Sequence, residues 1–173
     1  MMISRSMMIS RSLVALALAS LLSVSAAAQQ AFLVRHAERA DTVSDKPPAK
    51  GADPDLSDEG RARAASLATV LKDAEITAIF ATEFKRTQQT AAPLAKALGL
   101  KVTIVRSANT ADLIGQIKSS EGNVLVVGHS NTIPDVIKGL GGKTTASIAE
   151  DEFDNLFVVR RGAAPTVLRL HYR

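Results

Sequence analysis

The chain has 173 residues with 21 Lys and Arg against 17 Asp and Glu, a balance too even to support nucleic-acid binding through bulk charge. It contains no Cys, which excludes disulfides, cysteine-ligated zinc and thiol catalysis. With no Trp, one Tyr and five Phe, it offers little aromatic surface for stacking on bases.

The first 28 residues have the pattern of a cleaved secretory signal peptide. Arg5 and Arg11 precede an apolar run over residues 13–24, which is short for a membrane span, and small residues follow up to Ala28. We therefore expect cleavage near Ala28, a periplasmic or secreted location, and no membrane span afterwards. An uncleaved anchor helix is the alternative.

Residues 29–173 are long enough for one compact domain and too short for two. Without the two leader arginines, 19 basic residues face 17 acidic ones, a net charge of +2. The repeated MMISRS leaves both Met1 and Met7 open as the start, and the sequence does not predict an oligomeric state.

Apolar runs alternate with helical patterns along the rest of the chain, which is typical of an α/β sheet. We expect a three-layer αβα fold with a mostly parallel central sheet, in which the last two strands can form an antiparallel edge pair. The predicted strands cover residues 31–35, 76–81, 101–105, 123–127, 156–159 and 166–171. The predicted helices begin after the cap Ser57 and cover residues 84–98, 112–118 and 131–140 further along.

Two His and two Arg follow three of these strands. Arg35 and His36 end the first strand, Arg86 opens the helix after the second, and His129 follows the strongly apolar strand over 123–127. Because open α/β sheets bind ligands at the carboxyl ends of their strands, we expect these four side chains to share one site.

That set of groups suits phosphate chemistry. Arginine offers paired donors to phosphate oxygens and stays charged, while a neutral imidazole can attack phosphorus and a protonated one can donate to a phosphate oxygen. The helix that opens at Ser130 adds backbone donors and the positive end of its dipole. No metal and no cofactor are required by this chemistry.

The motifs LVRHAE, RTQQTA, GHSNT and LSDEGRARA resemble the signatures of the histidine phosphatase superfamily, branch 1, which is phosphoglycerate-mutase-like. Ala37 stands in the position of the family's Gly. The resemblance implies the phosphoglycerate-mutase-like fold, a phosphohistidine intermediate on His36, and a phosphate pocket of Arg35, Arg86 and His129. Ser130 is a further candidate for substrate binding.

The resemblance leaves the proton donor open. Mutases and sugar bisphosphatases of this branch use a Glu after the third strand, where this chain offers only Asp112. Glu83 and Glu38 are candidates by proximity to Arg86 and His36. A substrate with a good leaving group, such as a phosphohistidine or an anomeric phosphate, would not need a strong acid.

We therefore expect a metal-independent phosphoric monoester hydrolase whose substrate is a small phosphorylated metabolite or a phosphosugar. Alternatives are a phosphohistidine protein phosphatase and a non-catalytic phosphate-binding protein of the same fold. A metal hydrolase that uses His36, Glu38 and His129 is another, although no metal-ligand spacing such as H-x-x-x-H is present.

Overall fold

The computed structural model describes residues 29–43, 52–143 and 147–173. The predicted signal peptide, residues 1–28, lies outside the described residues and stays a prediction. In chain order the described elements are β1 (Gln30–Arg35), the 3-10 helix η2 (Ala40–Val43), α2 (Asp58–Leu71), β2 (Ile76–Ala81), α3 (Lys85–Leu98), β3 (Val102–Ile104), α4 (Thr110–Ser119), β4 (Asn123–Gly128), α5 (Thr132–Gly139), β5 (Asn155–Arg160) and β6 (Thr166–His171).

The strands form a six-stranded sheet in the order β3-β2-β4-β1-β5-β6. The pairs β2–β3, β2–β4 and β1–β4 are parallel, whereas β5 runs antiparallel to both β1 and β6. This confirms the predicted α/β class with a mostly parallel sheet and an antiparallel pair at one edge.

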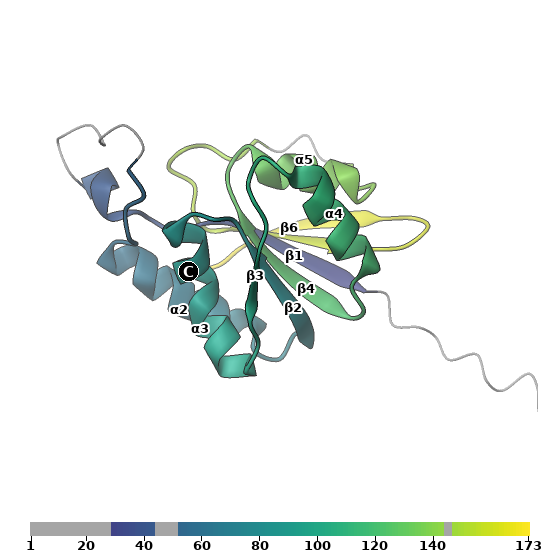
Figure 1. Ribbon diagram of the computed structural model, residues 1–173, viewed down its shortest axis with the longest axis horizontal. Helices are drawn as coiled ribbons and strands as arrows, with labels where there is room; N and C mark the ends of the chain where they lie inside the picture. The colour runs from purple at the N-terminus through teal and green to yellow at the C-terminus, as the bar shows by residue number, and fades with distance from the viewer. Residues whose placement is uncertain (1–28, 44–51, 144–146) are drawn as a thin grey trace, which may run out of the picture.

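The sheet is the middle of three layers, with α2 and α3 on one face and α4 and α5 on the other (Figure 1). Successive side chains of a strand point to opposite faces. Leu33 and Val126 accordingly pack with Ile133 and Ile137 of α5, in one apolar cluster. Burial on both faces explains why the strand over 123–127 is apolar throughout.

The helix ends follow the signals in the sequence. The Ser57 side chain accepts a hydrogen bond from the Gly60 backbone N–H at 3.1 Å, which caps α2, and Asp58 and Glu59 lie in its first turn. Helix α3 ends at Gly99, whose φ of 66° is a left-handed conformation that favours glycine. Strand β3 is shorter than predicted because it is an edge strand whose Thr103 and Ile104 are exposed.

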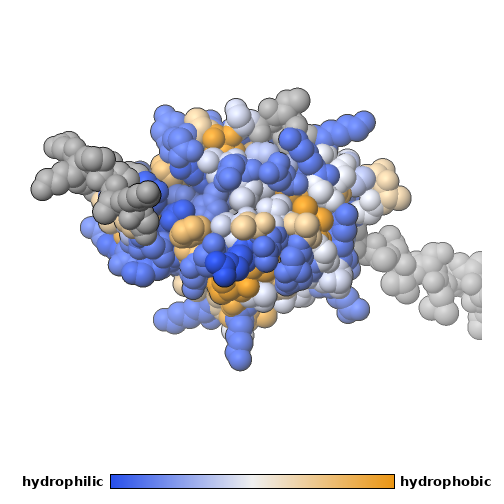
Figure 2. Space-filling model, turned by 45° about the horizontal axis from the view of Figure 1, so that its top comes forward, coloured by the Kyte–Doolittle hydropathy of each residue, from blue (hydrophilic) through white to orange (hydrophobic). Residues whose placement is uncertain are grey.

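The face drawn in Figure 2 is mostly hydrophilic, with small separate hydrophobic areas. The exposed large hydrophobic residues of the described chain are Val70, Ile104, Leu168 and Leu170. No helix in the described ranges is both long and apolar enough to span a bilayer.

Candidate active site

The carboxyl ends of β1, β2 and β4 lie side by side and bring the two predicted histidines together. Arg35 pairs with Gly128 in the parallel register, and the backbone N–H of His36 donates to the Gly128 carbonyl at 2.9 Å. The ring centroids of His36 and His129 are 5.4 Å apart. The predicted convergence of these strand ends is therefore present in the structure.

A cavity of about 460 Å³ opens at these strand ends. It is lined by all four predicted residues and by Ser130, together with residues that the sequence did not indicate. The lining residues are Arg35, His36, Arg39, Phe84, Arg86, Ser107, Ala108, His129, Ser130, Asn131, Thr132 and Glu150.

One ring nitrogen of His36 is engaged in a hydrogen bond. Its Nδ1 lies 2.8 Å from the Ala37 carbonyl oxygen, and because a carbonyl only accepts, Nδ1 carries the proton. Burial lowers the pKa of His36 to about 3 against the opposing effect of this hydrogen bond, and the nearby His129, Arg86 and Arg35 lower it further. At neutral pH the ring is uncharged, with the lone pair on Nε2.

His129 is fixed by a chain of hydroxyl groups behind it. Its Nε2 lies 3.0 Å from the Thr82 hydroxyl, which lies 2.9 Å from the Thr87 hydroxyl. When Thr87 donates to the Phe84 carbonyl at 2.8 Å, Thr82 donates to Thr87 and accepts from His129 Nε2. Burial, followed by the charge of Arg86, lowers the pKa of His129 to about 4. Its Nδ1 is thereby left as the nitrogen that can take up a proton.

Arg35 is buried and held mainly by the loop before β5. Its Nη1 donates to the carbonyl of Ala149 at 2.6 Å and, at 3.3 Å, to that of Glu152, while Nη2 donates to the Glu150 carboxylate at 2.9 Å. The guanidinium lies over the Phe153 ring at 4.4 Å. Backbone oxygens and an aromatic ring thus fix the plane of this cation.

Arg86 has a similar support from the first turn of α3. Its guanidinium lies over the Phe84 ring at 4.2 Å, and its Nη1 lies 3.6 Å from Asp53 Oδ1. Burial lowers the pKa of Arg86, as it does that of Arg35, but a guanidinium with a lowered pKa stays charged at neutral pH.

Both arginines keep a buried donor without a hydrogen-bond partner. Among the residues that the structure describes, the Nε of Arg35 and the Nε of Arg86 have none. A buried N–H without a partner costs free energy unless a ligand takes it up, so it marks a position for an acceptor. Two such donors on cationic groups favour an anion in this cavity.

The start of α5 contributes less free backbone than the sequence suggested. The backbone N–H groups of Thr132 and Ile133 both donate to the His129 carbonyl, at 3.1 and 3.0 Å. Ser130 lines the cavity as predicted, and its hydroxyl donates to Glu150 at 2.9 Å. The Thr132 hydroxyl accepts from the His129 backbone N–H at 2.9 Å and so fixes the turn that carries the histidine.

The three predicted proton-donor candidates lie outside this lining. The Glu38 carboxylate accepts hydrogen bonds from Arg63 of α2, whose Nε is 2.7 and 2.9 Å from its two oxygens. Glu83 accepts from the backbone and hydroxyl of Ser107; desolvation raises its pKa, but these hydrogen bonds lower it overall. Asp112 is exposed on α4, where it accepts from Gln116.

The described residues contain no group of three or more His, Asp or Glu side chains placed to hold a metal ion. The metal hydrolase that the sequence left open would need Glu38 beside His36 and His129. In the structure, Glu38 is instead bound to Arg63. This donor set therefore does not favour a metal centre.

Sequence reasoning missed Thr82, Phe84, Glu150 and Phe153. Phe84 lies two residues before Arg86, so its position under the guanidinium could have been considered from spacing alone. Thr82 follows β2 and could have been included as a residue at a strand end. Glu150 and Phe153 reach the site from the loop before β5, which contains none of the motifs.

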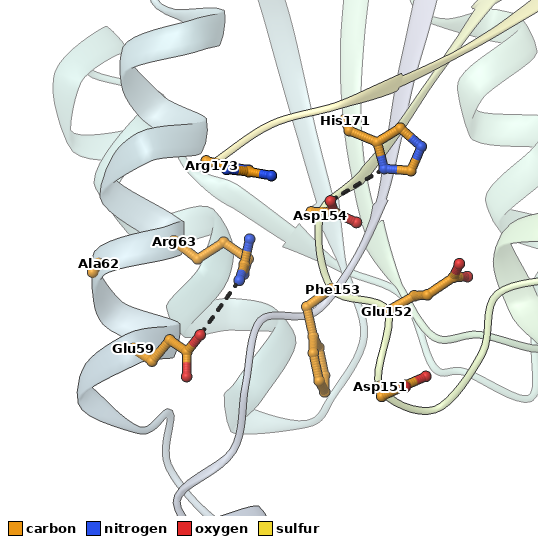
Figure 3. A pocket seen from close by; sticks show the side chains of 9 residues that line it. All are labelled: Glu59, Ala62, Arg63, Asp151, Glu152, Phe153, Asp154, His171 and Arg173. Atoms are coloured by element: carbon orange, nitrogen blue, oxygen red, sulfur yellow. Dashed lines mark ion pairs between the residues drawn. The ribbon is translucent and has the colours of Figure 1, made fainter.

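A second cavity, of about 620 Å³, lies beside the same loop and is drawn in Figure 3. Phe153, whose ring supports Arg35, also lines it. His171, which stands outside every motif, lies here 3.1 Å from Asp154, and Arg63 lies 3.7 Å from Glu59. Although this cavity is larger, its Arg63 and His171 lie against carboxylates, whereas the smaller cavity holds the unpartnered Nε groups of Arg35 and Arg86.

Comparison with known proteins agrees with these observations. Residues 31–107 match the sequence profile of the histidine phosphatase superfamily (branch 1), which confirms the resemblance for LVRHAE, LSDEGRARA and RTQQTA, whereas GHSNT lies beyond the matched residues. No match is found among curated protein sequences.

Solved structures with the same fold include several phosphatases. A putative alpha-ribazole-5'-P phosphatase from Escherichia coli is 16% identical with a TM-score of 0.67, over 83% of this chain and 96% of that one. The protein histidine phosphatase SixA, complexed with tungstate, is 18% identical with a TM-score of 0.63, over 83% and 97%. Mycobacterial glucosyl-3-phosphoglycerate phosphatase, with inorganic phosphate, is 15% identical with a TM-score of 0.63, over 83% and 96%. At these identities the likeness establishes the phosphoglycerate-mutase-like fold.

Proposed function

We propose, from the match of residues 31–107 to the histidine phosphatase superfamily, branch 1, that the chain is a phosphatase that acts through a phosphohistidine on His36. The observation that supports this most is the pair of unpartnered guanidinium donors on Arg35 and Arg86, beside a neutral imidazole with a free Nε2. These groups supply an anion site and a nucleophile in one cavity.

In the first step, Nε2 of His36 attacks phosphorus while Arg35 and Arg86 bind the phosphate oxygens. Reaction of this kind depends on alignment and on stabilisation of charge, which fixed cations in a buried site provide. The proton remains on Nδ1 and stays hydrogen-bonded to the Ala37 carbonyl oxygen. This hydrogen bond stabilises the positive charge that the ring gains on phosphorylation.

His129 has a different role, because its Nδ1 is the nitrogen that is left to take up a proton when the substrate brings negative charge into the cavity. The entering phosphate raises the pKa of His129 from about 4, since an anion nearby favours the protonated ring. The protonated Nδ1 then donates to a phosphate oxygen. Water finally attacks the phosphohistidine and releases phosphate.

We propose a small phosphorylated metabolite or phosphosugar as the substrate and the periplasm as the location. The location rests on the leader sequence, and a cavity of about 460 Å³ is within the range of small-molecule sites. No step uses a metal, so we propose a metal-independent reaction. A phosphohistidine protein phosphatase and a non-catalytic phosphate-binding protein are the alternatives that the test must separate.

The test is phosphate release by the purified protein from a panel of phosphomonoesters, phosphosugars and a phosphohistidine peptide, with and without EDTA. We expect release that EDTA does not change, loss of release in His36→Ala, and a reduction of about 10²- to 10³-fold in Arg86→Ala, as for removal of one charge-stabilising donor. Full turnover by His36→Ala would refute the nucleophile. Phosphate binding without turnover of any ester would favour the binding protein.

A further inference from the structure

One lining residue of the catalytic cavity has no part in the reaction described so far. Glu150, in the loop between α5 and β5, is the carboxyl-bearing residue among the described residues that line this cavity. Its Oε2 accepts from Arg35 Nη2 at 2.9 Å, and its Oε1 accepts from the Ser130 hydroxyl at 2.9 Å. Any role for it in the reaction rests on the proposed phosphatase function.

Glu150 lies at the open side of the cavity. Its side chain is 85% exposed, whereas that of Arg35 is 6% exposed, so the carboxyl group stands between the buried phosphate-binding groups and solvent. The leaving group of a phosphate ester must also lie toward solvent, because the phosphoryl group occupies the buried end. The carboxyl group and the leaving oxygen therefore share the mouth of the site.

Arg35 does not depend on Glu150 for its position. Two backbone carbonyls of the same loop, those of Ala149 and Glu152, bind its Nη1, and the Phe153 ring supports its plane. A phosphate can thus bind to Arg35, including the unpartnered Nε, while the loop keeps Glu150 nearby. The loop that fixes the phosphate-binding cation is the loop that carries the carboxyl group.

Of the other carboxylates near the site, Asp53 lies 3.6 Å from Arg86, but it is outside the cavity lining and its two oxygens accept from the Lys85 backbone N–H at 3.1 and 3.0 Å. Arg63 holds Glu38 on the α2 side, and two hydrogen bonds from Ser107 hold Glu83. Both carboxylates are acceptors in these contacts, and neither lines the cavity. Glu150 has one cationic contact, and that contact is with a group that the substrate itself must engage.

We propose that Glu150 is the catalytic residue that protonates the leaving group. As His36 Nε2 bonds to phosphorus, the bond from phosphorus to the ester oxygen breaks with its electron pair, and that oxygen takes the proton of the Glu150 carboxyl group. In the second step the Glu150 carboxylate takes a proton from the attacking water. Phosphate leaves, Nε2 regains its lone pair, and the carboxyl group is restored.

The substrate supplies the proton. A phosphate ester enters as the monoanion, binds Arg35 in place of Glu150, and passes its proton to the carboxylate, which no longer has the guanidinium as its partner. The second pKa of a phosphate ester is about 6, so kcat/KM for esters that need protonation declines as the pH rises above that value.

The test compares Glu150→Gln with the wild type on two ester classes. The variant should lose about 10²- to 10⁴-fold in kcat/KM on glycerol phosphate, whose alkoxide leaves poorly, because that is the usual contribution of a general acid. On 4-nitrophenyl phosphate, whose leaving group needs no proton, kcat/KM should stay within about threefold of the wild type, because kcat/KM reports the first step and not the hydrolysis of the phosphohistidine. Tungstate binding by the variant shows that the anion site is intact.

The matched control is Asp151→Asn, which changes an exposed carboxylate next in sequence that lines the second cavity. Its ratio of the two kcat/KM values should equal that of the wild type. An equal loss on both esters in Glu150→Gln would overturn the assignment, as would no loss on either or a gain on both. If the wild type turns over neither ester nor any other phosphate, the proposed phosphatase function is wrong. If the wild type is active but Glu150→Gln loses equally on both esters, only the role of Glu150 is wrong.

Discussion

At the scale of single residues, the site depends on which nitrogen of each histidine is free. The Ala37 carbonyl fixes the proton of His36 on Nδ1, and the Thr82 hydroxyl engages Nε2 of His129. The two rings therefore keep opposite nitrogens free: Nε2 of His36, the proposed nucleophile, and Nδ1 of His129, which takes up a proton in the proposed reaction.

Thr82 is a positioning residue in this arrangement, and its removal gives a direct prediction. Thr82→Val keeps the shape of a side chain that is 4% exposed but removes the partner of His129 Nε2. We expect kcat on 4-nitrophenyl phosphate to fall about tenfold, the effect of one lost hydrogen bond of about 1–1.5 kcal/mol. Thr82→Ser should restore most of the activity, and a Thr82→Val enzyme as active as the wild type would contradict this role.

The sequence could predict these catalytic residues only in part. Arg35, His36, Arg86 and His129 stand in local motifs at strand ends, so topology alone brings them together. The proton-donor prediction searched for carboxylates near those motifs in sequence. Glu150 lies well beyond the end of α5, in a stretch without periodic pattern, and it reaches Arg35 only through tertiary contacts.

At the scale of elements, helix α2 fixes the segment that carries the nucleophile. The Glu38 carbonyl, two residues after His36, accepts from the Ser57 backbone N–H at 3.0 Å, at the start of α2. Arg63 of the same helix binds the Glu38 side chain. The motif LSDEGRARA thus has a structural meaning: it docks a capped helix against the loop after β1.

Gly60 allows this docking, because a Cβ there would clash with the Glu38 carbonyl oxygen. Gly60→Ala should lower the free energy of unfolding by about 2–3 kcal/mol, since the clash is with backbone and one element must move. Urea unfolding measures the change. Gly115→Ala is the control: this helical glycine has open space around it, so alanine should be neutral or raise stability by up to about 1 kcal/mol. Equal effects of the two changes would rule out the docking argument.

The prediction of the elements themselves was most accurate where burial is complete. The apolar run at 123–127 and the capped helices correspond to β4, α2 and α3, with ends that differ by one residue or so. Strand β3 and helix α4 are less buried: β3 is one residue shorter than predicted at each end, and α4 begins two residues before the predicted range and ends one residue after it. An edge strand with exposed side chains carries little hydrophobic pattern, so its length depends on pairing with β2, which periodicity does not reveal.

At the scale of the whole molecule, function imposes a cost on stability. The fold buries His36 and Arg35 and partly buries His129 and Arg86 in one place, and the described protein groups leave the Nε donors of both arginines without a partner. Burial of cationic groups without a partner is unfavourable. An anion that binds the folded state and not the unfolded chain should therefore stabilise the protein. Above the Kd of the anion, the free energy of unfolding should rise with the logarithm of the anion concentration.

The same burial gives the protein a pH dependence with a definite sign. The pKa of His36 is lowered to about 3 and that of His129 to about 4, whereas an exposed histidine has a pKa of 6.5. Below pH 6.5 the unfolded chain therefore binds protons that the folded protein does not, so the free energy of unfolding falls as the pH falls from about 6.5 toward 4.

Urea unfolding in acetate and neutral non-phosphate buffers measures this slope of the free energy of unfolding against pH. His36→Asn, whose amide can still donate to the Ala37 carbonyl, should reduce the loss between pH 7 and pH 5 by more than about 1 kcal/mol, because it removes one of the two titrating groups. An unchanged slope in that variant would mean that His36 titrates in the folded protein as it does in the unfolded chain, and the lowered pKa of His36 would be wrong.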